Sequence, residues 1–297
     1  METVVVERQP WEPAEKNMRV PVVEDLAGVR IFDGELRLEE PDGQLVAIIC
    51  EANRKDHARL AWMGREILAK VSWHDGNLAP SSSNRLSGLK YPNITFGTTA
   101  PAPLRRRYAC SVSGLDRELP RLGVELRNLA ATAWAALQAY SPEIAEEVLG
   151  RVMPKVHDDW LLFEAPWTSG IINNSAALPY DRDGGNLAGI WSAQYVMRNR
   201  VTGGYLHLPE YDVMFACEDK SLLLFNGQSV WHGVTPMAIP PHPEAYRYSV
   251  VFYTKAGCRN CLSASEEAQR AQAKATEHDF PREHVLEGME HAPARDG

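Results

Sequence analysis

The sequence predicts a mainly β protein of the α+β class, with a jelly roll or barrel at its centre and helices beside it. Short apolar runs, separated by turns that contain Gly and Pro, follow one another from Leu187 onwards. The clearest helical periodicity lies upstream, between Pro120 and Tyr140. With 297 residues, of which 44% are hydrophobic, the chain is long enough to bury a full core.

The elements before the β-rich stretch are expected to form an N-terminal part, residues 1–155, that braces the core. In chain order they are an extended arm (1–25), strands (28–38 and 45–50), a helix (57–71), a long loop (75–103), a strand (108–113) and helices (120–140 and 141–150). The helix over 120–140 is the best defined of these, because apolar residues recur in it at spacings of three and four. The next helix has an N-cap serine, a proline and an acidic residue at its start, in Ser141-Pro142-Glu143.

The core itself is expected over residues 156–262, followed by a helix and a polar tail over 263–297. The predicted strands of the core are 160–163, 169–173, 187–197, 204–208, 221–225, 229–234 and 247–254. The helix after the core is expected over about 265–276, where charged residues dominate.

Charge and cysteine usage limit the classes of function. A net charge of −8 and a pI of about 5.6 argue against a wholly basic DNA-coating protein, although a local basic face is enough for DNA binding. The N-terminal residues carry charges and prolines where a signal peptide needs an apolar run, and no stretch approaches the ~18 apolar residues of a membrane span. Five cysteines without dense spacing predict a reduced, cytoplasmic protein rather than a disulfide framework. Cys258 and Cys261 form a single CxxC motif, which we interpret as structural rather than as a zinc site.

Three features between residues 174 and 255 suggest a metal site. An acidic turn, Asp181-Arg182-Asp183, comes first; His232 follows a β-type run; and Arg247 opens another such run. A carboxylate and an imidazole on one face, with other positions open, suit iron(II). The forked guanidinium of an arginine fits the far carboxylate of a 2-oxo acid bound to that metal.

The stretch from about residue 173 to 261, under a third of the chain, resembles the TET/JBP family of 2-oxoglutarate- and iron(II)-dependent nucleic-acid dioxygenases. The resemblance depends on short pieces in the family's order and at family-like spacing. These pieces are Asn174-Ser175, Pro179-Tyr180, Arg182-Asp183, Gly185-Asn186-Leu187, Trp191-Ser192, Gly203-Gly204, Leu206 to Glu210, His232-Gly233-Val234 and Arg247-Tyr248-Ser249. The resemblance implies a double-stranded β-helix (jelly roll) core, with iron(II) and 2-oxoglutarate as cofactors.

The resemblance also implies roles for particular residues. Asp183 and His232 would bind the metal together with the residue at position 181. Arg247 and Ser249, two residues apart and therefore on one face of a strand, would bind 2-oxoglutarate. The family has a second arginine upstream of the core, for which Arg107 in the run Arg105-Arg106-Arg107 is the best candidate. That run could instead be a solvated basic turn.

The target base would be read by residues around the acidic turn. Asn186 occupies the base-reading position of the family, and an amide both donates and accepts hydrogen bonds. Tyr180 and Trp191 could stack on a base that has left the helix, at a cost of a few kcal/mol. Each has a structural alternative: Asn186 could cap a turn, and the two aromatic residues could belong to the core.

One position departs from the family's His-x-Asp motif, because Asp181 stands where the family has histidine. Two acids and one imidazole would alter the charge of the metal site. Three interpretations remain open. The residue could be a substitution that cripples a family-type enzyme, a native ligand of a working variant, or a mark of a natural non-catalytic reader of DNA.

The sequence therefore predicts a dioxygenase that hydroxylates the 5-methyl group of a pyrimidine in DNA, with 5-methylcytosine favoured over thymine. A non-catalytic DNA-binding module and a dioxygenase acting on free nucleotides are the alternatives. No membrane partner is expected, and the sequence does not predict the oligomeric state.

Overall fold

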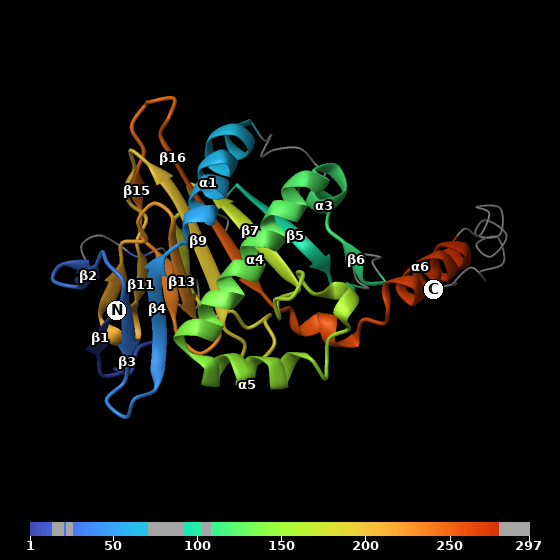
Figure 1. The fold of residues 1–297 in the computed structure, drawn as a ribbon, viewed down its shortest axis with the longest axis horizontal. Helices are drawn as coiled ribbons and strands as arrows, with labels where there is room; N and C mark the ends of the chain where they lie inside the picture. The colour runs from blue at the N-terminus through green and yellow to red at the C-terminus, as the bar shows by residue number, and fades with distance from the viewer. Residues whose placement is uncertain (14–20, 22–25, 71–91, 103–107, 279–297) are drawn as a thin grey trace, which may run out of the picture.

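A computed structural model of the protein describes residues 1–13, 21, 26–70, 92–102 and 108–278. Two β-sheets form the centre of the fold (Figure 1). The main sheet has nine strands in the order β1-β3-β4-β13-β9-β16-β7-β5-β6. Their bounds are β1 Glu2–Val5, β3 Leu36–Glu39, β4 Leu45–Glu51, β5 Asn93–Thr99, β6 Ser111–Val112, β7 Ser169–Asn174, β9 Ser192–Asn199, β13 Ser221–Phe225 and β16 Tyr246–Tyr253.

A smaller sheet of five strands packs against one face of the main sheet. Its order is β2-β12-β11-β14-β8. The strands are β2 Arg30–Phe32, β8 Leu178–Asp181, β11 Leu206–Leu208, β12 Val213–Phe215 and β14 His232–Val234. A separate pair joins β10 (Thr202–Gly203) to β15 (Met237–Ala238). Apolar side chains of both sheets, such as Val196, Phe215 and Leu223, form one core cluster. The predicted mainly β fold with a jelly-roll core is therefore confirmed.

The other face of the main sheet is covered by helices. They are α1 (Arg54–Trp62), α3 (Gly114–Glu118), α4 (Pro120–Tyr140) and α5 (Pro142–Val152). The last helix, α6 (Ala264–His278), lies beside β6 at the edge of the sheet (Figure 1). Figure 1 shows α4 lying across the strands, with α5 near one end of it. The predicted apolar stripe of α4 faces the sheet, because Leu126, Leu129 and Leu137 are fully buried and belong to the core cluster on this side.

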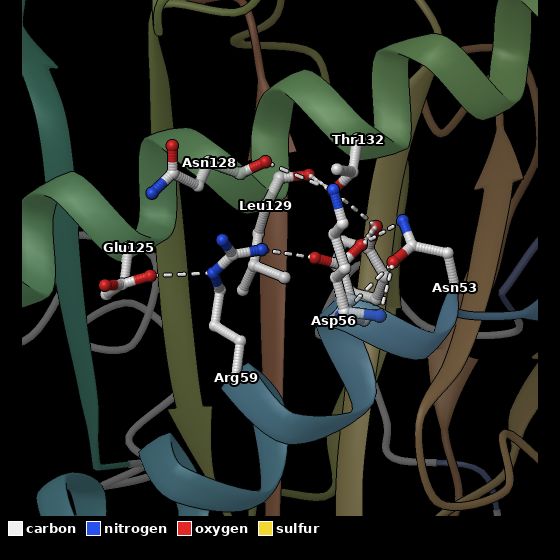
Figure 2. Close-up of polar contacts among 9 residues, drawn as sticks. Asn53, Asp56, Arg59, Glu125, Asn128, Leu129 and Thr132 are labelled. Atoms are coloured by element: carbon white, nitrogen blue, oxygen red, sulfur yellow. Dashed lines mark hydrogen bonds and ion pairs between the residues drawn. The ribbon is translucent and has the colours of Figure 1, made fainter.

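A polar cluster ties α1 to α4 and to the sheet (Figure 2). Asp56 is fully buried and accepts hydrogen bonds from the side chains of Asn53, Arg59 and Tyr195. Arg59 also donates to Glu125 of α4 at 2.7 Å. Because each charged group has partners, the cluster fixes α1 over the sheet without an unpaired buried charge.

Several predictions about local structure were wrong. The single strand expected over 28–38 is two strands, β2 and β3, which belong to different sheets. The loop expected over 75–103 contains β5, an inner strand between β6 and β7, because Asn93–Thr99 has the β-prone residues that its Gly- and Ser-rich surroundings obscured. The strand expected over 160–163 is instead the end of a 3-10 turn, Asp158–Trp160, followed by a single bridge between Leu162 and Ala165. The N-terminal arm opens with a strand, β1, which pairs with β3 in parallel.

The cysteines also differ from the expectation of a fully reduced chain. Cys110 and Cys261 form a disulfide between residues 151 positions apart. Cys258, the other half of the CxxC motif, is a buried free thiol, as are Cys50 and Cys217. This pairing joins the segment before β6 to the segment before α6, two regions that the spacing of the cysteines could not connect.

The strands of residues 1–155 are part of the main sheet: β4 pairs with β13 over five residue positions, from Ser221↔Glu51 to Phe225↔Ala47. The division at residue 155 stays a prediction. Among the residues described, no helix is long and apolar enough to cross a membrane.

Candidate active site

Pairing between β8 and β14 of the smaller sheet brings the predicted metal ligands together. His232, the first residue of β14, lies opposite Asp181, the last residue of β8. Asp183 follows two residues later, and its Oδ1 lies 3.9 Å from Nε2 of His232. The predicted juxtaposition of Asp183 and His232 is thus present, at a strand end where backbone pairing stops.

The imidazole of His232 is held in a defined orientation. Its ring packs edge-on against Phe225 of the main sheet, with centroids 5.0 Å apart. Its Nδ1 lies 3.1 Å from the carbonyl oxygen of Val230, to which it can donate. A proton on Nδ1 leaves the lone pair of Nε2 directed towards Asp183, and this is the tautomer that a metal-binding histidine needs.

The loop between β13 and β14 holds the acidic turn in place. The backbone N–H of Asp183 donates to the carbonyl of Gly227 at 3.0 Å. Gly227 also leaves room for the carboxylate, because a Cβ at this position would lie 2.4 Å from Oδ2 of Asp183. Gln228 donates from Nε2 to the carbonyl of Asn186 at 2.9 Å. These two loop residues were not identified from the sequence, where Asn226-Gly227 signals only a turn.

Asp181 lies at the same site but does not complete a group of three ligands. Its Oδ1 accepts the backbone N–H of Arg182 at 2.8 Å. Burial raises the pKa of Asp181, and the neighbouring Asp183 carboxylate raises it further, while His232 lowers it. Within the described part of the chain, no three His, Cys, Asp or Glu side chains are grouped closely enough to hold a metal.

Glu210 links the acidic turn to the segment before His232. This buried carboxylate accepts from Arg182 at 2.8 Å and from Arg8 at 2.7 Å through Oε1. Through Oε2 it accepts the backbone N–H of Trp231 at 2.7 Å. One side chain therefore fixes residues adjacent to both Asp183 and His232. No local pattern in the sequence indicates this role of Glu210, because its partners lie far from it along the chain.

Arg247 lies on β16, inside the space between the two sheets. It is 1% exposed, and its Nε and Nη2 have no hydrogen-bond partner among the described residues. Burial lowers the pKa of Arg247 to about 10, so the guanidinium is charged at neutral pH. Gly204 adjoins it, because a Cβ there would lie 2.8 Å from Nε of Arg247. A buried cation with unsatisfied donors requires an anionic partner.

Of the two other residues predicted to bind 2-oxoglutarate, only Ser249 lies in the described part of the chain. Ser249 is buried two residues beyond Arg247, and its Oγ accepts from Nδ2 of Asn173 at 3.3 Å. Arg107 lies outside the described residues.

The predicted base-binding residues separate into different regions. Asn186 lies three residues after Asp183, and its backbone N–H donates to the carbonyl of Asp183 at 2.9 Å. Tyr180 alternates with Asp181 on β8 and so faces away from His232; its hydroxyl bonds to Nδ1 of His207 at 2.6 Å, and its ring contacts Trp11. Trp191 is buried in the core on the helix side of the main sheet. The structure therefore places Asn186 beside the metal-binding candidates and does not bring Tyr180 or Trp191 to them.

These residues can be tested for their fit to a metal and a 2-oxo acid. Two acceptor atoms, Nε2 of His232 and Oδ1 of Asp183, face each other at 3.9 Å. A single divalent cation with bonds of about 2 Å can bind both atoms and remove the repulsion between two facing acceptors. The unpartnered donors of Arg247 fit a carboxylate. Arg247 therefore fits a 2-oxo acid, and His232 and Asp183 fit two of the three expected metal-ligand positions. Asp181 stands at the third position.

Comparison with solved structures shows which known folds this chain resembles. The chain is similar to NgTET1, whose structure was solved in complex with 5mC DNA, with a TM-score of 0.57 and 10% sequence identity over 92% of this chain and 90% of that chain. A 2OG-Fe(II) oxygenase-family oxidoreductase from Burkholderia pseudomallei also matches, with a TM-score of 0.39 and 11% identity over 73% of this chain and 86% of that chain. No protein-family model and no curated protein sequence matches. The TET-like fold implied by the sequence motifs is thus confirmed at the level of the fold.

Proposed function

We propose that this protein is a 2-oxoglutarate- and iron(II)-dependent dioxygenase that hydroxylates the 5-methyl group of a pyrimidine in DNA, with 5-methylcytosine favoured over thymine. The observation that supports this most strongly is Arg247, a fully buried guanidinium with two donor nitrogens that have no partner in the described part of the chain. It lies on the sheet face that packs towards His232. A protein that had no anionic ligand would gain nothing from keeping this charge in its core.

Each residue of the site has a task in this proposal. Asp183 and His232 would hold the iron, and Asp181 would occupy the third protein position. Arg247 would bind and orient the distal carboxylate of 2-oxoglutarate, with the hydroxyl of Ser249 beside it. Iron(II) and the oxo acid would supply the activation of O2 that hydroxylation of a methyl group requires. Asn186, in the turn that carries Asp183, would position the extruded base by hydrogen bonds to its polar edge.

A second candidate function is a non-catalytic DNA-binding module with the same fold. It is favoured by Asp181, which takes the place of a nitrogen ligand, and by the lack of a group of three donors in the described residues. Metal content after reconstitution with iron(II) separates the two candidates. The dioxygenase would retain about one metal per chain, whereas the binding module would retain none.

The proposed function is tested by calorimetric titration of 2-oxoglutarate into protein that contains Mn(II), which replaces iron(II) without redox turnover. We expect Arg247→Ala to weaken binding by roughly 10- to 150-fold, because a charge-assisted hydrogen bond contributes about 1.5–3 kcal/mol. Arg270→Ala, which removes a half-exposed arginine from α6, serves as the matched control and should leave binding unchanged. Equal affinities of Arg247→Ala and the parent protein would refute the role of Arg247.

A further inference from the structure

Gln194 is another residue on this sheet face with a buried polar atom that has no partner among the described residues. The residue lies on β9, at the centre of the main sheet, where it is opposite Leu223 of β13 and Val251 of β16. Its side chain is 6% exposed, and its Nε2 has no hydrogen-bond partner within the part of the chain that the structure describes. Nearly all buried polar groups in folded proteins have a partner, so this amide requires an explanation.

Strand register places Gln194 on the same sheet face as Arg247. Residues directly opposite each other on neighbouring strands share a face, and so do alternate residues of one strand. Gln194 is opposite Val251, and Val251, Ser249 and Arg247 alternate along β16. Ser249 is therefore one step of two residues away from Gln194 along the sheet, and Arg247 is two steps away.

The same register relates Gln194 to the candidate metal ligands. On β13, Phe225 is two residues beyond Leu223, the neighbour of Gln194, and lies on the same face. The ring of Phe225 contacts His232. Along this face of the sheet, the order is thus Phe225 beneath His232, then Gln194, then Ser249, and finally Arg247. At the backbone each step is about 7 Å long, since an antiparallel strand rises about 3.4 Å per residue. A small ligand can therefore connect these positions only through the long side chains of Gln194 and Arg247.

We propose that Gln194 is a binding residue for the 2-oxo acid and donates a hydrogen bond from Nε2 to the carboxylate next to the oxo group. The proposal deepens the proposed function and rests on it. Gln194 lies between the metal candidates and Arg247 in this order, so a 2-oxo acid with its oxo end at the metal and its far carboxylate on Arg247 would pass beside it. An amide N–H on the sheet face that lines this space supplies a neutral donor to a carboxylate, without adding another charge beside the metal.

A structural role and a ligand-binding role for Gln194 predict opposite effects on stability. If the amide stabilised the fold, replacing it with an apolar side chain would lower the melting temperature. If the amide is unpaired until a ligand binds, Gln194→Leu removes an unsatisfied buried group, and the ligand-free protein should melt at the same or a higher temperature. Gln194→Met, which is closer to Gln in length and adaptable in shape, provides a second variant.

The experiment is the titration of 2-oxoglutarate into Mn(II)-containing protein, with melting temperatures measured for the ligand-free proteins. The panel holds the parent, Gln194→Leu, Gln194→Met, Arg247→Ala and a control, Ser221→Ala. Ser221 is buried on the same sheet face, and its Oγ has no partner among the residues that the structure describes. It starts β13, and β9 separates it from β16. We expect at least tenfold weaker binding for both Gln194 variants, without a lower melting temperature, and unchanged binding for Ser221→Ala.

The outcomes distinguish the two proposals. Gln194 variants that bind 2-oxoglutarate like the parent, while Arg247→Ala binds it weakly, would overturn the role of Gln194 and leave the proposed function in place. A parent protein that does not bind 2-oxoglutarate would overturn both. A lower melting temperature or failure to fold in both Gln194 variants would assign the residue to the structural core, which also overturns the proposal.

Discussion

Nε2 of His232 and Oδ1 of Asp183 lie 3.9 Å apart, across the end of the β8–β14 pair. Strand pairing holds His232, the first residue of β14. A backbone hydrogen bond to Gly227, in the loop before β14, holds Asp183. The juxtaposition depends on strand register and on the packing of that loop.

Gly227→Ala should weaken binding of a divalent metal. The added Cβ would lie 2.4 Å from Oδ2 of Asp183, so the carboxylate has to move. Titration of Mn(II), followed by calorimetry, measures the effect, which we expect to be about tenfold or more. Gly185→Ala, two residues after the acidic turn, is the matched control, since a Cβ there meets nothing within 4 Å. If both variants bind Mn(II) like the parent, Asp183 is not a ligand.

Glu210→Gln should lower both the stability of the fold and the affinity for metal. The substitution removes the negative charge that Arg8 and Arg182 share and weakens the bond to the N–H of Trp231, the residue before His232. Because both arginines are partly exposed, we expect a loss of about 1–3 kcal/mol in the free energy of unfolding. Urea denaturation and Mn(II) titration provide the two measurements.

Glu244→Gln is the control for Glu210→Gln, because Glu244 is an exposed carboxylate 3.6 Å from Arg200. Surface pairs of this kind contribute little, so its stability should match that of the parent. A Glu210→Gln variant that loses stability but keeps full metal affinity would limit Glu210 to a structural role.

Asp181→His should raise the affinity for iron(II) and the base-oxidising activity together. Two imidazoles and one carboxylate form the facial triad that suits iron(II), and the change removes a carboxylate that lies close to Asp183. Asp181→Asn is the control, since it removes the charge without supplying a nitrogen ligand. If Asn raises the iron affinity as much as His does, relief of repulsion rather than ligation explains the gain.

Asn186→Ala should reduce base oxidation and leave uncoupled turnover of 2-oxoglutarate unchanged, in whichever form of the protein is active. One lost base contact is expected to cost about 1–3 kcal/mol. Succinate release without DNA and oxidised nucleosides with DNA are measured in parallel. Asn199→Ala, which removes an exposed amide bonded to the carbonyl of Glu244, is the control. Unchanged oxidation of DNA would make Asn186 a turn residue only.

The sequence predicts those features that depend on local pattern. The bounds of α4 and β13 agree with the prediction, because apolar spacing defines the helix and flanking turns define the strand. Strand β5 was missed because a Gly- and Ser-rich stretch precedes it and pairing with β7, distant in sequence, makes it a strand.

Site residues were predictable only where a motif names them. The motif led to Asp183, His232 and Arg247, whose surroundings fit the roles proposed for them. It could not reveal Gly227, Glu210 or Gln194, because their contacts come from strand register and loop packing. Tyr180 was assigned to the base for its position beside the motif. Alternation along β8 turns it to the face opposite His232, where it bonds to His207.

The central claim is tested most directly by mass spectrometry of nucleosides after incubation of DNA containing 5-methylcytosine with iron(II), 2-oxoglutarate and the protein. The parent protein and Asp181→His are assayed side by side, with Asp183→Ala as the inactive reference. We predict 5-hydroxymethylcytosine in the Asp181→His reaction, in larger amounts than with the parent and absent with Asp183→Ala. If neither the parent nor Asp181→His oxidises the base, although both bind metal and 2-oxoglutarate, the assignment to pyrimidine methyl groups in DNA is wrong.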